Sequence, residues 1–472
     1  MPDVRVATIH DREVVLTGAI VDDFKSRLLG PLLLTEDPGY DEARTLWNAM
    51  IDRRPSLIVR CAGAADVIAS VKFAREHDLL VSVKSGGHNI AGMALSDRCL
   101  MIDLSPMKWV RVDPEARTAS VGAGATLRLV DHETQAFGLA TPVGINSTTG
   151  IAGLTLGGGF GWLSRSLGLT VDNLLSADVV TADGKLILAS EKETPDLFLG
   201  IRGGGGNFGI VTSFRFRLHP VGPQVLAGLI VHPFKDAGKI FRHYRSFVAQ
   251  APDNLTCWVV LRKAPPLPFL PPDVHGKEIF VIALVYAGDM KQGEKVLEPL
   301  RKFGQPIADV VGPTPFVGFQ QAFDPLLTPG ARNYWKSHNF TELPDGVIDT
   351  LIDYAGKLPT PLSEIFLGQL GGAINRVPKD ATAYPHRDAN FVMNVHTRWE
   401  DKMLDGACVD WSRKIFDALT RYATGGVYVN FISEGEERVA SAFGSNHERL
   451  AKLKKKFDPA NFFRTNQNIR PA

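Results

Sequence analysis

The chain has 472 residues, of which 44% are hydrophobic and 22% charged, a composition typical of a folded globular protein. Lysine and arginine total 52 against 51 aspartate and glutamate, so the net charge of +1 gives no electrostatic basis for binding nucleic acid. The length predicts two or three folding units, because single cores stop growing near ~250–300 residues.

Cysteine usage and the apolar runs exclude further classes of protein. The four cysteines (Cys61, Cys99, Cys257 and Cys408) are too scattered for a disulfide framework, and no cysteine or histidine cluster has the spacing of a zinc site. No apolar run reaches the ~18 residues that a membrane span needs. Residues 1–5 lack the basic start of a signal peptide. We therefore expect a cytoplasmic protein with no metal and no membrane partner.

Residues 57–137 read as alternating strands and helices. Apolar runs and helical spacing predict the following order: strand 57–60, helix 65–77, strands 79–83 and 100–104, strand 118–126 and helix 127–137. The strand at 79–83 breaks into the turn Ser85-Gly86-Gly87-His88-Asn89. Adjacent glycines let a backbone approach a ligand closely, and turn amides can face an anion such as a pyrophosphate. We expect His88 to lie beside whatever this turn holds; the alternative is a turn histidine without a ligand.

Glycine is dense in the next part of the chain. Seven glycines fall within residues 144–161, which would be costly in a regular helix and fits a backbone packed against a flat ligand. Residues 179–188 predict a hairpin with Asp183-Gly184 at the turn. A GxGxxG pattern at 204–209 is followed by alternating residues at 210–218, which predict a strand. A dinucleotide fingerprint should open a helix, so we reject a Rossmann site here.

The character of the chain changes after residue 220. Glycines become fewer and amphipathic helices alternate with strands, predicted at 279–286, 364–370 and 390–397. The proline-rich segment 264–272 predicts an irregular loop. We interpret 221–427 as a second domain inserted into the first, to which the chain returns near Tyr428. The lysine run at 452–456 is expected on the exposed face of a helix.

Polar side chains in the second domain are candidates for contact with a substrate. Asn394, His396 and Arg398 share one face of the predicted strand, because side chains alternate along a strand. His396 is a candidate base or a residue that orients the base; a structural histidine is the alternative. Tyr334 and Lys336 would share a face if 332–337 is a strand, and they are further candidates for contact with a substrate. A surface strand with a snorkelling lysine is the alternative, and both stay open.

From about residue 43 to 471 the chain resembles the flavoprotein oxidases of the vanillyl-alcohol-oxidase superfamily, and among them the berberine-bridge-enzyme-like branch. The resemblance is carried, in the family's order, by residues 85–88, 149–161, 167–174, 198–209, 428–431 and 457–469. It implies an α+β fold with a two-subdomain, PCMH-type FAD-binding domain at 1–220. An inserted α+β substrate domain, an antiparallel sheet flanked by helices, would occupy 221–427, and the segment 428–472 would complete the FAD domain.

The resemblance also implies FAD as cofactor, attached covalently through His88. Many relatives carry a second link through a cysteine, but this chain has Asn146 at that place and no cysteine between Cys99 and Cys257. The link should therefore run through His88 alone, which puts an oligosaccharide substrate in doubt. The residues that the resemblance assigns to the cofactor are Ser85, Gly86, Gly87, His88, Asn89, Gly150, Gly153, Gly158, Gly159, Gly161, Gly209, Ile210, Val211, Asn430 and Asn466.

For catalysis the resemblance favours Tyr428 as the base, with Asn394 and His396 as polar contacts. Free tyrosine has a pKa near ~10, so such a base needs a polarising neighbour. Thr149 takes the position that borders the flavin and affects dioxygen access, with a plain turn threonine as the alternative. A second family tyrosine is Phe160 here.

We therefore expect an FAD-dependent oxidoreductase that moves hydride from a small-molecule alcohol or amine C–H to flavin N5. Dioxygen would reoxidise the flavin and give hydrogen peroxide, and a homodimer is one candidate assembly. Three alternatives stay open: a dehydrogenase with another electron acceptor, a tailoring oxidase or cyclase of secondary metabolism, and a flavin-binding protein without turnover.

Overall fold

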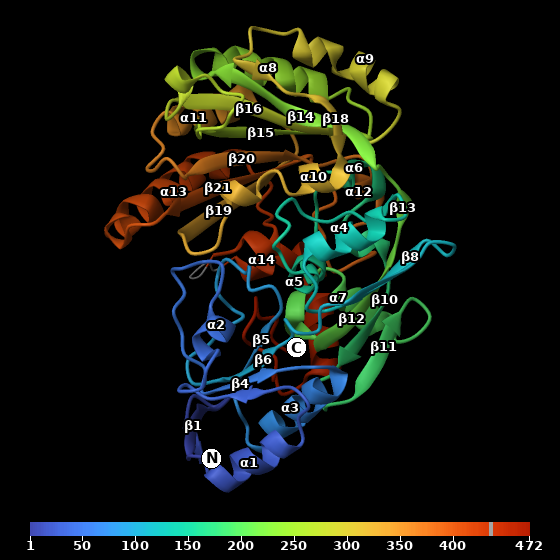
Figure 1. The fold of residues 1–472 in the computed structure, drawn as a ribbon, viewed down its shortest axis with the longest axis vertical. Helices are drawn as coiled ribbons and strands as arrows, with labels where there is room; N and C mark the ends of the chain where they lie inside the picture. The colour runs from blue at the N-terminus through green and yellow to red at the C-terminus, as the bar shows by residue number, and fades with distance from the viewer. Residues whose placement is uncertain (434–437) are drawn as a thin grey trace.

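The computed structural model describes residues 1–433 and 438–472, so four residues of the predicted C-terminal segment lie outside the described residues. The chain forms two parts, each built around its own sheets (Figure 1). In Figure 1 a large sheet with its helices lies at the top, and the N-terminal and C-terminal segments lie together below it. In the described ranges no helix combines the length and the apolar character of a membrane span.

The first sheet carries the loop that ends in His88. Its order is β3 (Leu32–Leu33), β4 (Leu57–Arg60), β6 (Leu100–Asp103) and β5 (Val81–Lys84), with β4 and β5 both parallel to β6. The crossover helix α3 (Ala64–Glu76) connects β4 to β5, which lie parallel on the two sides of β6. The predicted strand–helix–strand–strand order is confirmed here, with ends that differ by at most two residues.

A second, antiparallel sheet follows in the order β11, β10, β12, β8, β7. Its strands are β7 (Val110–Asp113), β8 (Thr118–Gly122), β10 (Leu174–Val180), β11 (Leu186–Ser190) and β12 (Ile210–Arg217). The hairpin predicted at 179–188 is confirmed by the pairing of β10 with β11. The glycine run at 204–209 contains one 3-10 turn, Gly205–Asn207, and leads directly into β12 instead of an α-helix, as the rejection of a Rossmann site requires.

One expectation about the glycine-dense segment is wrong. A short helix, α5 (Ile151–Leu156), forms within residues 144–161. Its residues Ile151, Ala152 and Thr155 are buried, so packing against the core outweighs the low helix propensity of Gly153.

The third sheet is the large one at the top of Figure 1. Its order is β17 (Ala308–Asp309), β14 (Gln224–Pro233), β16 (Glu278–Tyr286), β15 (Leu255–Lys263), β20 (Glu364–Gln369), β21 (Phe391–Trp399) and β19 (Arg332–Phe340), and β18 (Gly312–Pro315) pairs with β14. All its strand pairs are antiparallel. The strands predicted at 279–286, 364–370 and 390–397 are therefore confirmed.

Helices cover one face of this sheet (Figure 1). They are α8 (Ala237–Val248), α9 (Met290–Arg301), α11 (Asp345–Ala355) and α13 (Asp405–Leu419), and their apolar residues form one core with alternate residues of the strands. Because side chains alternate along a strand, the remaining residues of β15, β19, β20 and β21 face the other way, toward the lower part of the molecule. The predicted domain boundaries at 220 and 427 stay predictions.

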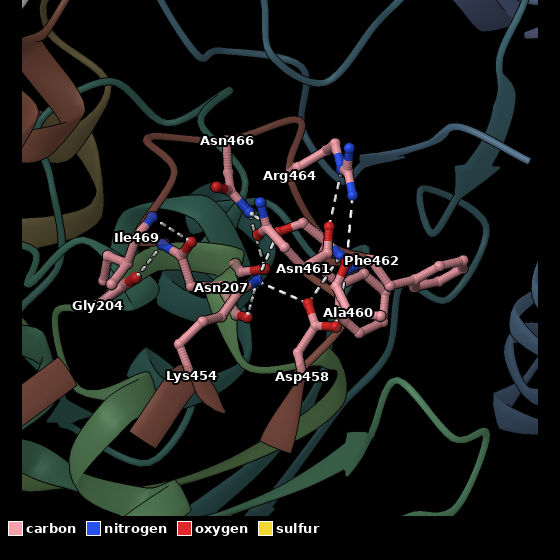
Figure 2. Close-up of polar contacts among 12 residues, drawn as sticks. Gly204, Asn207, Lys454, Asp458, Ala460, Asn461, Phe462, Arg464, Asn466 and Ile469 are labelled. Atoms are coloured by element: carbon pink, nitrogen blue, oxygen red, sulfur yellow. Dashed lines mark hydrogen bonds and ion pairs between the residues drawn. The ribbon is translucent and has the colours of Figure 1, made fainter. Parts of the chain in front are cut away.

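The C-terminal segment packs into the lower part of the molecule. Helix α15 (His447–Phe457) and the residues after it share a core with α7 (Pro195–Ile201). The expectation for the lysine run is wrong at one position, since Lys454 is fully buried while its neighbours Lys452, Lys455 and Lys456 are exposed. Figure 2 shows the reason: the Lys454 ammonium lies among oxygen atoms of the chain.

Candidate active site

A cavity of about 330 Å³ lies between the lower part of the molecule and the bare face of the large sheet. The lower part contributes the turn after β5, the glycine-dense segment, the loop before β12 and the C-terminal segment. The large sheet contributes aromatic side chains and His396. This volume is in the range of small-molecule sites, about 300–1,000 Å³.

Two glycines bring the His88 turn against the glycine-dense segment. A Cβ atom on Gly86 would lie 2.3 Å from the main-chain nitrogen of Gly150, so no larger residue fits at this contact. The Ser85 hydroxyl donates to the main-chain oxygen of Ala123 at 2.6 Å and fixes the start of the turn. Gly87 has φ +69°, a left-handed conformation that favours glycine.

His88 is held at one end of the cavity by two threonines and a tryptophan. Its Nε2 lies 3.0 Å from the Thr148 hydroxyl, and its Nδ1 lies 3.4 Å from the Thr149 hydroxyl. The Trp47 ring stacks on the imidazole at 5.3 Å between centroids. Burial lowers the pKa of His88 to about 4, so the imidazole is neutral at physiological pH and keeps a nucleophilic nitrogen lone pair.

The cradle next to His88 fits a flat cofactor. A Cβ on Gly153 or on Gly206 would meet nothing within 4 Å, and both glycines line the cavity, so their missing side chains are part of its space. The Asn466 Oδ1 atom is buried without a hydrogen-bond partner among the described residues, and it also lies in the lining segment. An amide oxygen in this state costs free energy unless a ligand donates to it.

Most of the residues assigned to the cofactor from the sequence line this cavity. They are Ser85, Gly86, Gly87, His88, Asn89, Gly150, Gly153, Gly209, Ile210, Val211, Asn430 and Asn466.

Three predicted cofactor residues, Gly158, Gly159 and Gly161, are not in the lining. A Cβ on Gly159 would lie 2.2 Å from Thr170, and one on Gly161 would lie 1.9 Å from the oxygen of Val143. These glycines therefore serve close packing of the chain on itself.

Polar contacts of the C-terminal segment hold the part of the cradle around Gly204 and Asn207 (Figure 2). Lys454 Nζ donates to the main-chain oxygens of Asn207 and Phe463, each at 2.8 Å, and to Asp458 at 2.7 Å. The Asn207 amide donates to the oxygen of Gly204 at 2.8 Å and accepts from the Ile469 N–H at 2.9 Å. The loop that contains Gly205 and Gly206 is thus held by residues far away in the sequence.

The cavity has an aromatic wall, to which the large sheet contributes Trp258, Trp335 and Phe366. Ring contacts run from His88 through Trp47 and Trp335 to His396, with centroid distances of 5.3, 5.8 and 4.6 Å. Trp258, Phe366, Phe160 and Phe431 complete the wall. No aspartate, glutamate, lysine or arginine of the described ranges lines the main cavity.

A smaller chamber of about 60 Å³ branches from the aromatic end, under the loop at 264–270. It shares Ile145, Trp258, Leu327, Phe366 and His396 with the main cavity. Its remaining lining is apolar except for the ion pair of Arg262 with Glu364. It comes from β14, β15, β16, the start of β20, the loop at 264–270, and Trp162, Phe323 and Leu326.

His396 is the polar group of the aromatic wall. Its Nδ1 lies 3.0 Å from Glu364 Oε1, and Arg262 holds the other oxygen of that carboxylate at 2.7 Å. The His396 Nε2 atom is buried and has no hydrogen-bond partner in the described part of the chain.

Tyr428 also reaches the cavity, and its hydroxyl oxygen is already engaged. It accepts from the Gly159 N–H at 3.1 Å and from the Asn430 amide at 2.9 Å. Burial raises the pKa of Tyr428 to about 12, although these two hydrogen bonds act in the opposite direction. The phenol is therefore protonated at neutral pH.

The structure places the side chains of two further predictions away from the cavity. Asn394 is fully buried beside Phe366 and is not in the lining, and neither atom of its amide has a partner in the described ranges. Tyr334 and Lys336 do share a face of β19, but that face meets the helical layer: Lys336 lies over the Phe416 ring of α13.

Sequence reasoning missed Trp47, Trp335 and Glu364. Trp335 lies between Tyr334 and Lys336 in the predicted strand. Its side chain is therefore on the opposite face, for which no role was predicted. Glu364 is the one charged residue of its predicted strand, which is a signal, but its place beside His396 depends on strand register. Trp47 precedes the first predicted element and left no signal.

Known proteins match the chain over most of its length. Residues 55–190 match the FAD binding domain family, and residues 427–470 match the berberine and berberine-like family. An uncharacterised FAD-linked oxidoreductase of Bacillus subtilis is 33% identical, with 95% of this chain and 98% of that protein covered.

Solved structures that share the fold include two oxidases. The crystal structure of 6-hydroxy-D-nicotine oxidase from Arthrobacter nicotinovorans has a TM-score of 0.85 and 27% identity, and the match covers 94% of this chain and 98% of that one. A xylooligosaccharide oxidase from Myceliophthora thermophila, solved with xylobiose, has a TM-score of 0.83 and 26% identity over 96% of this chain and 99% of that one.

Proposed function

Because the chain belongs to the berberine and berberine-like family of FAD-linked oxidoreductases, we propose that it oxidises a small apolar alcohol or amine at the carbon bearing the hydroxyl or amino group. One observation carries the proposal. One cavity is lined both by the glycine cradle with His88 and by an aromatic wall that contains His396. Bound FAD supplies the oxidant, which takes a hydride equivalent from that carbon.

We further propose that His88 holds the FAD covalently and that no second link forms. The neutral imidazole at the mouth of the cradle supports this role, because a nucleophilic nitrogen needs its lone pair. The four cysteines are free and buried, and none of them lines the cavity in the described ranges. Buried free thiols also support the proposed cytoplasmic location, where thiols stay reduced.

The lining supports a substrate with a flat, apolar body. An ionised substrate would lose its hydration without gaining a charged partner in the main cavity. Aromatic rings favour offset or edge contacts with another ring, and the side chamber offers space for an apolar substituent. An aromatic compound, such as the nicotine derivative for which one similar enzyme is named, fits this lining better than the oligosaccharide for which another is named.

Dioxygen is the proposed electron acceptor, with hydrogen peroxide as the product. Thr149 supports this part of the proposal by its place: its hydroxyl contacts His88 and its residue lines the cavity, so it borders the space where reduced cofactor and oxygen would meet. A hydroxyl there can donate a hydrogen bond to a reduced oxygen species.

Acid precipitation of the purified protein tests the cofactor and its attachment. We expect the washed wild-type pellet to stay yellow and its band to fluoresce in a denaturing gel, whereas His88→Ala loses both. His132→Ala, an exposed histidine, is the matched control and should behave as the wild type. Flavin retained by His88→Ala after denaturation, or lost from the wild type, would refute covalent attachment at His88.

Turnover tests the reaction. A panel of arylalkyl alcohols and amines is incubated with the protein in air, and peroxide is followed with a peroxidase-coupled dye. We expect peroxide formation in step with substrate loss. Reduction of the flavin under anaerobic conditions without peroxide in air would replace the oxidase by a dehydrogenase.

A further inference from the structure

Four residues form one row across four neighbouring strands of the large sheet. Register pairs Arg262 with Glu364, Glu364 with His396, and His396 with Trp335. Their side chains lie on the face that looks toward the cavity, because residues paired across a sheet point to the same side. Regular strands therefore fix the position of the His396 ring, and Trp335 and Phe366 stack against it at 4.6 and 5.7 Å.

The carboxylate in this row sets the tautomer of the histidine. Burial by itself would raise the pKa of Glu364, but Arg262 and the hydrogen bond with His396 outweigh burial and hold the pKa below its ordinary value. The carboxylate is therefore ionised, and an imidazole nitrogen that faces it carries the ring hydrogen. That nitrogen is Nδ1, so Nε2 presents a bare lone pair, and it is the Nε2 atom that lacks a partner.

Tyr428 has the opposite character. Two N–H donors occupy the acceptor positions of its hydroxyl oxygen, and its own hydrogen is the group left to offer. A phenol in this state donates a hydrogen bond; it does not accept a proton. The expectation that Tyr428 is the base is thus less well supported by geometry than the alternative on the large sheet.

We propose that His396 accepts the proton of the substrate through Nε2 and that Glu364 is the positioning residue that makes this possible. The assignment deepens the proposed function and rests on it. The O–H or N–H bond of the substrate breaks, its proton goes to Nε2, and its electron pair forms the second bond to carbon. The C–H bond electrons leave as hydride to FAD, the oxidant of the family's activity. The imidazolium that results is paired with the Glu364 carboxylate.

The charged groups around the ring define the pH dependence. The Glu364 carboxylate on β20 faces the ring, Arg262 on β15 and Arg398 on β21 carry the charges that interact with that carboxylate, and β19 and the Phe431 turn contribute neutral rings. Tyr428 and His88 are titratable groups from the lower part that share the cavity. Protonation at low pH removes the Nε2 lone pair, so the rate of substrate oxidation should fall as the pH is lowered.

The first arm of the test needs no substrate. FAD-loaded protein with 15N in its 12 histidines is examined by two-bond 1H–15N correlation spectra at neutral pH, with His396→Gln to assign the signal. We expect hydrogen on Nδ1 alone in the wild type and a mixture of both tautomers in Glu364→Gln. Glu364→Asp restores a carboxylate and should recover most of the single tautomer. A wild-type His396 with its hydrogen on Nε2 would overturn the proposal.

The second arm follows anaerobic loss of the flavin's visible absorbance, with 1-phenylethanol and N-methylbenzylamine as probes. The pH dependence is measured with the alcohol, because its hydroxyl stays neutral across the range whereas the amine is itself protonated at low pH. We expect His396→Gln to slow reduction by about 10²–10⁴-fold and to abolish its fall at low pH. Tyr428→Phe should keep that fall. If the rate of flavin reduction no longer fell at low pH in Tyr428→Phe but still fell in His396→Gln, Tyr428 and not His396 would be the base. If neither probe reduces the wild type, the proposed substrate class fails, while the tautomer still decides the role of His396.

Discussion

Gly153 occupies an unusual place for a glycine, the third residue of a regular helix whose outer side is the cradle. In most helices alanine would be more stable at such a position by about 1 kcal/mol. Here the position of the missing Cβ is open space within the cavity, so a side chain would compete with the cofactor and with nothing else. Stability and cofactor binding should therefore respond to substitution in opposite directions.

Gly153→Ala is expected to leave the melting temperature of the apoprotein unchanged or slightly higher and to weaken FAD binding by about tenfold or more, equivalent to ~1.4 kcal/mol. The measurement is a fluorescence titration with FAD in the His88→Ala background, where binding is reversible if the link runs through His88. Gly406→Ala is the matched control, since Gly406 also lies in a helix with open space at its Cβ but away from the cavity. Equal affinities in the two variants would show that Gly153 does not border the cofactor.

Residues with a local signal were the ones that sequence reasoning could place. Ser85 to His88 stand out because a strand ends in two glycines, and the structure lines the cavity with them. Gly158, Gly159 and Gly161 look the same in sequence, but their partners, such as Thr170 and Val143, lie in other segments, so their packing role was invisible. The same holds for Glu364, whose meaning comes from the strand beside it.

At the scale of elements, α15 and the residues after it act as a clasp on the glycine loop at 203–206. The clasp is the set Asn207, Lys454, Asp458, Phe463 and Ile469, joined by the contacts in Figure 2. The charges of Lys454 and Asp458 are both fully buried, so each depends on the other and on main-chain partners. Asp458 also accepts from the N–H groups of Phe462 and Phe463, at 2.7 and 2.9 Å.

Lys454→Met should lower the free energy of unfolding by ~3–5 kcal/mol, the usual cost of leaving one partner of a buried pair alone. It should also lower the FAD content of the purified protein, because Asn207 loses one of the contacts that hold the loop. Chemical denaturation and the ratio of flavin to protein absorbance measure the two effects. Lys455→Met, one residue on and exposed, should change stability by no more than about 0.5 kcal/mol. Similar losses in both variants would contradict the clasp.

Elements were predicted well where periodicity is strong and poorly where tertiary contacts decide. The strands of the large sheet and the β10–β11 hairpin follow from alternation and from Asp183-Gly184. Helix α5 was not expected, because its stability comes from burial of Ile151 and Ala152, which outweighs propensity. Lys454 was assigned to the exposed side of its helix, because a buried lysine requires a partner that the helical pattern does not reveal.

At the scale of the whole molecule, buried polar contacts join the two parts around the cavity. The Gln320 amide of α10 (Phe316–Gln320) donates to Asp131 of α4 (Leu127–Gln135) at 3.0 Å. The Arg387 guanidinium bonds Asp172 through two nitrogens, each at 2.8 Å. The predicted α+β class with an inserted antiparallel sheet is confirmed by the solved relatives, whereas contacts such as these depend on how the parts meet and left no trace in the sequence pattern.

The Asp131 contact should make stability depend on pH. Burial raises the pKa of Asp131 from 3.8 to about 7, although the hydrogen bond from Gln320 lowers it. Between these values the folded protein binds more protons than the unfolded chain, so its free energy of unfolding falls as the pH rises from about 4 to about 7. Asp131→Asn removes this contribution. The difference in melting temperature between Asp131→Asn and the wild type should therefore shift in favour of the variant as the pH rises from about 5 to about 8.

Glu133→Gln is the control for this prediction, because that carboxyl lies on the same helix and is partly exposed. Thermal denaturation of the apoproteins at both pH values gives the comparison. Parallel pH dependence in Asp131→Asn and the wild type would mean that Asp131 is ionised in the folded protein.

The clasp also has a consequence for the order of events during translation. The turn with His88 and the loop at 203–206 leave the ribosome long before Lys454 and Ile469, which hold that loop through Asn207. Domains fold as units while the chain is being made, but this cradle cannot be assembled until residues late in the sequence have emerged. We therefore expect FAD to bind after translation, and we expect a nascent chain that stalls before α15 to expose the glycine loop to proteases.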